Sequence, residues 1–62
     1  MKEELKKYLE LTNKSIETHK DLAIAEIQRE EMIPATNDLL TMRDLKAQKL
    51  LIEKILKGAE DK

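Results

Sequence analysis

Apolar residues recur at helical spacing along the first half of the chain. When residues are placed at intervals of about 100° around an axis, one sector of roughly 60° collects Leu5, Leu9, Thr12, Ile16, Ala23 and Ile27. The spacing between them is heptad-like, which is typical of helices that pack side by side. This stripe predicts an amphipathic helix over residues 2–32, with one face turned toward a neighbour.

The second half of the chain carries a wider apolar pattern. Two rows alternate at heptad spacing, and further leucines widen them on both sides: Leu45, Ile52 and Ala59 form one row, Thr41, Gln48 and Ile55 the other, and Leu40, Leu51 and Leu56 flank them. The arc approaches about 180°, which is more than one neighbouring helix can cover. The pattern predicts a helix over residues 37–57 with at least two neighbours.

Pro34 lies between the two patterns and predicts the turn. A helix that continued through it would lose a backbone hydrogen bond, and Ile33 before it would be pushed away from helical geometry. Thr36, Asn37 and Asp38 then offer oxygen atoms to the free amides of a new helix. We therefore expect one domain over residues 1–62, with a helix over 2–32, a turn over 33–36, a helix over 37–57 and a frayed tail over 58–62 that begins at a glycine cap.

The two expected helices differ in length, and this difference predicts self-association. A helix of about 30 residues extends about 45 Å, whereas one of about 20 residues extends about 30 Å. Apolar side chains near the amino end would then project beyond the shorter helix. The expected fold is an all-α helical hairpin that dimerises into a four-helix bundle, with an interface formed by Leu5, Tyr8, Leu9, Ile16, Leu45, Ile52 and Ile55.

A break in the first helix would give a monomeric three-helix bundle instead. Residues 12–18 contain several weak helix formers, and Thr18 with Asp21 could cap a new helix. This segment has no glycine or proline, however, and the apolar stripe keeps its phase through it. The unbroken helix is therefore the preferred interpretation.

Composition supports a small protein that needs a partner to complete its core. The 62 residues are 40% hydrophobic and 40% charged, and there is no cysteine. Disulfides and zinc–thiolate sites are thus excluded, which leaves oligomerisation as the usual remedy for so small a core. No apolar run approaches the roughly 18 residues of a membrane span, and the charged amino-terminal segment does not resemble a signal peptide. We expect a cytoplasmic protein, and the excess of lysine over arginine suggests a bacterial or phage source.

The candidate chemistry is sparse. His19, the only histidine, lies on the same helical side as Glu26 and Glu30. Metal sites in helical bundles draw on Glu-x-x-His pairs, which this sequence lacks, so we interpret His19 as a polar residue that sets the register of the seam. Ser15 is one turn from His19 without pocket-forming loops, and a single glycine excludes a phosphate-binding loop. We expect no enzyme, no cofactor and no metal.

Charge placement predicts a binding face on the second helix. Basic residues are interleaved there with apolar ones, and the expected partner-binding set is Leu39, Met42, Arg43, Lys46, Lys49 and Leu50. An acidic protein would suit this face. The plainer alternative is a solvated face whose lysine stems cover apolar neighbours. Nucleic acid is a weaker alternative, because the net charge is −1, arginine is scarce and stacking aromatic residues are nearly absent.

These features together predict a small, non-enzymatic helical protein that forms a homodimer and binds another macromolecule. A protein partner is preferred, and the action would be that of a stoichiometric regulator, inhibitor or assembly factor. The second hypothesis is a nucleic-acid-binding four-helix bundle that uses the basic face. No membrane association is expected.

Overall fold

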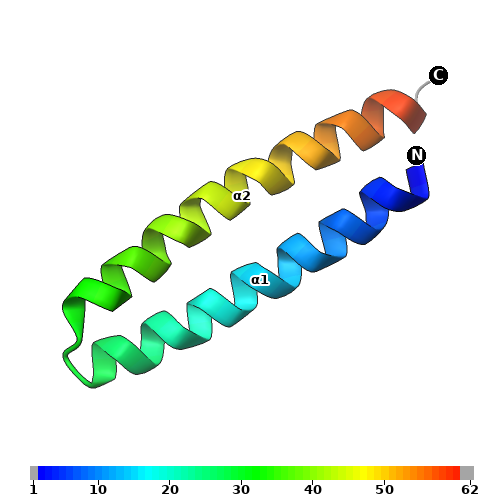
Figure 1. The fold of residues 1–62 in the computed structure, drawn as a ribbon. Helices are drawn as coiled ribbons and strands as arrows, with labels where there is room; N and C mark the ends of the chain where they lie inside the picture. The colour runs from blue at the N-terminus through cyan, green and yellow to red at the C-terminus, as the bar shows by residue number, and fades with distance from the viewer. Residues whose placement is uncertain (1, 61–62) are drawn as a thin grey trace.

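The chain folds into two antiparallel helices joined by a short turn (Figure 1). In the computed structural model, residues 2–60 are described, apart from the side chain of Glu60. Helix α1 spans Lys2–Gln28 and helix α2 spans Met32–Glu60, and residues 2–60 contain no strand. The hairpin measures 49 × 15 × 12 Å. The predicted all-α helical hairpin is confirmed.

Helix α1 ends in a Schellman motif with Glu30 as its left-handed residue. The amide of Glu31 donates to the carbonyl oxygen of Glu26 at 2.8 Å, and the amide of Glu30 donates to that of Ile27 at 3.0 Å. These bonds satisfy the last carbonyl groups of the helix. Glu30 has a φ of 61°, in the region that glycine usually occupies. The chain therefore reverses at residues 29–31 without using a glycine.

Pro34 lies inside the first turn of α2, so the predicted turn over 33–36 was wrong. The amide of Ala35 donates to the carbonyl oxygen of Glu31 at 3.2 Å, which makes Glu31 the N-cap residue directly before the helix. An amide at the position of Pro34 would have no acceptor within the helix. The carbonyl that the proline ring would meet belongs to Glu30, which lies outside α2. Proline thus opens the second helix and does not interrupt the first.

The predicted boundaries on either side of this turn shift with it. α1 ends four residues before the expected position 32, and α2 begins five residues before the expected position 37. Thr36, expected to cap, lies within α2 and donates from its hydroxyl to the carbonyl oxygen of Met32 at 2.8 Å. At the other end, α2 continues through Gly58 to Glu60, so the expected glycine cap and the start of the tail at 58 were also wrong. Residues 61–62 of that tail lie outside the described residues.

The two helices are nearly equal in length, so the expected overhang was wrong. α1 has 27 residues and α2 has 29, and Figure 1 shows the two ends of the hairpin level with each other. Leu5 and Leu9 are consequently half-buried against α2. The apolar side chains that remain exposed lie along both helices.

The helix α1 is continuous through residues 12–18, so the three-helix alternative was wrong as well. Thr12 and Thr18 are accommodated because their hydroxyls donate to carbonyl oxygens four residues earlier, those of Tyr8 at 2.8 Å and Lys14 at 3.0 Å. Thr12 is buried with 4% of its surface exposed. The weak helix formers of this segment therefore remain within one helix.

A narrow seam between α1 and α2 forms the core. Small side chains, Ala23 and Ala35, are buried near the turn, where they allow the helices to approach closely. Toward the open end the buried side chains become larger, with Ile16 on α1 and Ile52 and Leu56 on α2. On α1 the buried positions follow the expected apolar stripe, except that Ile27 remains 47% exposed. On α2 the stripe is rotated, because Leu56 is buried whereas Ile55 remains 48% exposed.

Candidate interaction surfaces

A polar pair connects the two helices one turn away from the buried alanines. His19 Nδ1 on α1 lies 2.7 Å from Asp38 Oδ1 on α2, and the side chains are 31% and 16% exposed. Asp38 was expected to cap a helix, but α2 begins earlier and carries it into the seam instead. The expected position of His19 at the seam is confirmed, and its role in setting the register stays a prediction.

Glu26 completes this cluster, and its environment raises the pKa of its carboxyl group. Its Oε1 is buried and receives no hydrogen bond from the side chains and backbone that the structure describes. A hydrogen bond with the carboxylate of Asp38 raises the pKa of Glu26, and burial and the negative charges of Asp38 and Glu31 act in the same direction. The hydrogen bonds from Glu26 and His19 lower the pKa of Asp38. The pKa values of the two carboxyl groups are therefore shifted in opposite directions.

The cluster links α1 to α2 through the contact of His19 with Asp38. Within residues 2–60, no group of three or more histidine, cysteine, aspartate or glutamate side chains is arranged to hold a metal ion. His19 and Asp38 hold each other in place at the seam. Ser15 lies at a separate depression between the helices, which Tyr8 and Gln48 also line.

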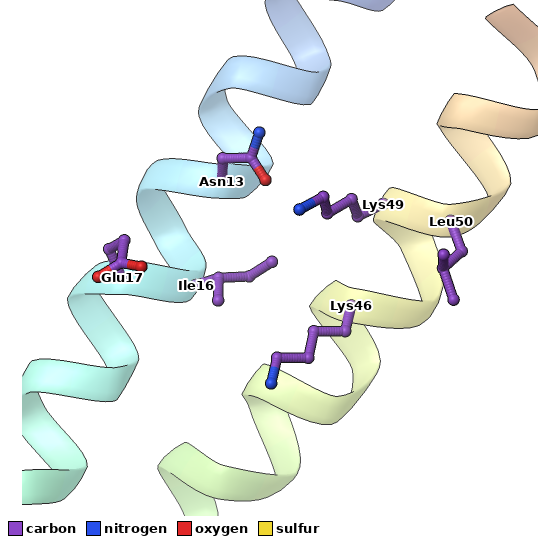
Figure 2. A pocket seen from close by; sticks show the side chains of 6 residues that line it. All are labelled: Asn13, Ile16, Glu17, Lys46, Lys49 and Leu50. Atoms are coloured by element: carbon purple, nitrogen blue, oxygen red, sulfur yellow. The ribbon is translucent and has the colours of Figure 1, made fainter.

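A groove runs along one side of the seam, and we call it the lysine groove. It has a volume of about 590 Å³ and is lined by Asn13, Ile16, Glu17, Lys46, Lys49 and Leu50. Figure 2 shows Ile16 pointing from α1 toward α2, while the lysine side chains extend from α2 toward α1. Lys49 is half-buried, and Leu50 is 68% exposed. The groove thus combines two cationic groups with apolar surface.

The structure brings three of the six predicted partner-binding residues into the lysine groove, namely Lys46, Lys49 and Leu50. Leu39 is 49% exposed, and its position seven residues before Lys46 places it on the same side of α2. Met42 is half-buried. Arg43 is exposed, pairs with its neighbour Asp44 at 3.3 Å and is not part of the groove lining. Asn13 and Glu17 were missed, because their contribution depends on how α1 is rotated against α2.

An apolar flank lies on the other side of the seam. It contains a depression of about 270 Å³, which is lined by Tyr8, Leu11 and Ser15 of α1 and by Leu45 and Gln48 of α2. Helical spacing extends this surface along both helices. We define the apolar flank by its large exposed side chains, which are Tyr8, Leu11, Leu22, Leu40, Leu51 and Ile55, each between 45% and 62% exposed.

The predicted interface residues are distributed over two different environments. Ile16 and Ile52 are buried between the helices of one chain, and Leu5, Leu9 and Leu45 are half-buried there. These five side chains therefore contribute mainly to the hairpin itself. Tyr8 and Ile55 belong to the apolar flank. The other flank residues were not in the predicted interface, although Leu40 and Leu51 were placed at the edges of the apolar arc of the second helix.

Comparison with protein-family models, curated proteins and solved structures gives no match for this chain. Neither helix within residues 2–60 has a stretch long and apolar enough to cross a membrane. Functional interpretation therefore depends on the residues described above, and chiefly on the two sides of the seam.

Proposed function

We propose that this chain is a non-enzymatic helical protein that self-associates through its apolar flank and binds another protein. The observation that carries the proposal is the imbalance between buried and exposed apolar side chains. Among the described residues, the buried apolar side chains are Ile16, Ala23, Ala35, Ile52 and Leu56, whereas twelve large apolar side chains are exposed. A core this small rarely maintains a fold by itself.

A second copy of the chain is the simplest cover for the apolar flank. The six side chains of the flank come from both helices, so two hairpins that meet there would form a four-helix bundle. One broad side of the hairpin measures 49 by 15 Å. Its projected area is close to the roughly 800 Å² that each partner buries in a stable interface. One side of the hairpin is thus large enough to form the interface of a homodimeric bundle.

The lysine groove stays on the surface of such a dimer and supplies the partner-binding side of the proposal. The protein would act stoichiometrically, as a regulator, inhibitor or assembly factor. The absence of cysteine and the lysine-rich composition agree with a cytoplasmic setting in a bacterial or phage-infected cell. The nucleic-acid alternative has less support, because only two lysines enter the groove and no aromatic side chain lines it.

Matched variants on the two sides of the seam test the self-association. Leu11→Glu combined with Leu51→Glu places charges on the apolar flank, and we expect sedimentation velocity to show a shift from dimer to monomer. The control is Leu39→Glu with Leu50→Glu, which introduces equal charge on the opposite side at comparably exposed positions. We expect the control to remain dimeric. A dimer that survives the first pair but not the second would place the interface on the lysine-groove side.

A further inference from the structure

The lysine groove carries positive charge that the hairpin leaves unneutralised. Among the side chains that the structure describes, no salt bridge joins Lys46 or Lys49 to a carboxylate. Glu17, the acidic residue of the lining, has its Oε2 at 4.0 Å from Nζ of Lys20 instead. The two ammonium groups thus remain available to an anionic ligand.

Apolar surface accompanies this charge along the same side of the hairpin. Leu50 is 68% exposed at the wall of the groove, and Ile16 lies between the helices at its floor. Ile24 lies seven residues after Glu17 and is 47% exposed, which continues the apolar surface toward the turn. A purely anionic ligand such as a phosphate would leave this apolar surface in water.

We infer that the lysine groove binds an acidic amphipathic helix of a partner protein, which lies against α1 and α2 as a third helix. Apolar side chains of the partner cover Ile16 and Leu50, and its carboxylates pair with Lys46 and Lys49. This inference rests on the proposed function and adds the chemistry of the partner. A helix suits the groove because side chains three or four residues apart share one helical face. The spacing of Lys46 and Lys49 matches carboxylates placed in that way.

A nucleic acid fits the same groove less well. Sequence-independent binding of single strands draws on aromatic side chains that stack on the bases and on basic residues along the backbone. The lining of this groove has two lysines, two apolar side chains, an amide and a carboxylate. The carboxylate of Glu17 would repel phosphate groups, whereas a protein helix can place a polar side chain beside it.

The test uses two synthetic helical peptides and the whole protein. The first peptide, about 18 residues long, repeats leucine at helical spacing with glutamates beside it; the second replaces every glutamate by lysine. Fluorescence anisotropy measures binding of each peptide. We expect the unmodified protein to bind the acidic peptide about tenfold more tightly than the basic one. Lys46→Glu combined with Lys49→Glu should reverse this preference.

Lys14→Glu combined with Lys54→Glu is the matched control. It makes the same change in net charge at exposed positions outside the groove lining, and we expect it to keep the preference for the acidic peptide. A reversed preference with helicity unchanged in circular dichroism is a gain of binding by the folded variant. If the charge reversal lowers helicity in circular dichroism, a milder pair of variants is used. Lys46→Gln with Lys49→Gln changes the groove, and Lys14→Gln with Lys54→Gln is its control. The groove variant must then lose more affinity for the acidic peptide than the control.

Equal binding of both peptides, or an equal loss in the groove variant and the control, would overturn the inference. A competition experiment tests nucleic acid. If a single-stranded oligonucleotide displaces the labelled acidic peptide at a lower concentration than unlabelled acidic peptide does, the inference is overturned in favour of nucleic acid. Mass measurements on the same samples separate this inference from self-association. If the protein is a dimer but does not prefer the acidic peptide, only the assignment of the groove is contradicted. If it is a monomer that still prefers the acidic peptide, only the proposed dimer is contradicted.

Discussion

The left-handed conformation of Glu30 gives a prediction that tests the position of the turn directly. Glu30 has a φ of 61°, which an L-residue with a side chain adopts at a cost of about 1–2 kcal/mol relative to the right-handed region. Glu30→Gly removes this cost. Glycine also gives the unfolded chain more freedom, which offsets about 0.4–1 kcal/mol. We therefore expect a net stabilisation of about 0.5–1 kcal/mol.

Thermal unfolding followed by circular dichroism measures the effect. For a domain of this size, 1 kcal/mol corresponds to roughly 4–8 °C in Tm, so the expected rise is about 2–8 °C at equal protein concentration. Glu30 also places negative charge at the carboxyl end of α1, where the helix dipole disfavours it. Glu30→Gln is the control, because it removes the charge and keeps the side chain.

The comparison between these two variants tests whether residue 30 has a left-handed backbone. We expect Glu30→Gly to be more stable than Glu30→Gln, because only glycine relieves the backbone. If the two variants have the same Tm, or if glycine lowers it, residue 30 is not left-handed. A turn centred on Pro34 would then become the better description.

Three further perturbations test the seam. Because the folded chain raises the pKa of Glu26, the stability from this carboxyl is present below its ordinary value of 4.5 and is lost as pH rises through the raised pKa. Glu26→Gln should therefore raise Tm at pH 7 by an amount that shrinks toward pH 4; an equal change at both values contradicts the assignment. Ile52→Ala, at a side chain 5% exposed, should destabilise by about 2–5 kcal/mol in urea, whereas Leu50→Ala should change stability little. Thr12→Val removes a hydroxyl that bonds within its own helix and should stay within about 1 kcal/mol of the unmodified protein in the same assay; a larger loss would give this hydroxyl another role.

Helical periodicity was sufficient to predict the hairpin and most of the seam. The stripe on α1 correctly placed Thr12, Ile16 and Ala23 in the core, because burial on one side of a helix repeats with the helical period. It could not locate the ends of the helices. Pro34 was read as a breaker, although proline in the first turn of a helix removes no hydrogen bond. The residue that reverses the chain is Glu30, whose type gives no indication of a left-handed backbone.

The two candidate interaction surfaces were predictable only in part. Lys46, Lys49 and Leu50 could be recognised as one face of a single helix, since their spacing is a property of α2 alone. Their relation to Asn13 and Glu17 depends on the rotation of α1 against α2, which one-helix periodicity does not specify. The pair of His19 and Asp38 was hidden for a related reason. With α2 expected to begin at 37, Asp38 stood at the end of a helix and not within the seam.

The mass of the unmodified protein in solution tests the central claim most directly. One chain has a mass of 7.2 kDa, and the account predicts that light scattering after size-exclusion chromatography gives twice this value at micromolar concentration. Such a dimer would cover the exposed side chains of the apolar flank. A mass of 7.2 kDa together with full helicity and cooperative unfolding would contradict the account, because the isolated hairpin would then be stable with its apolar flank in water.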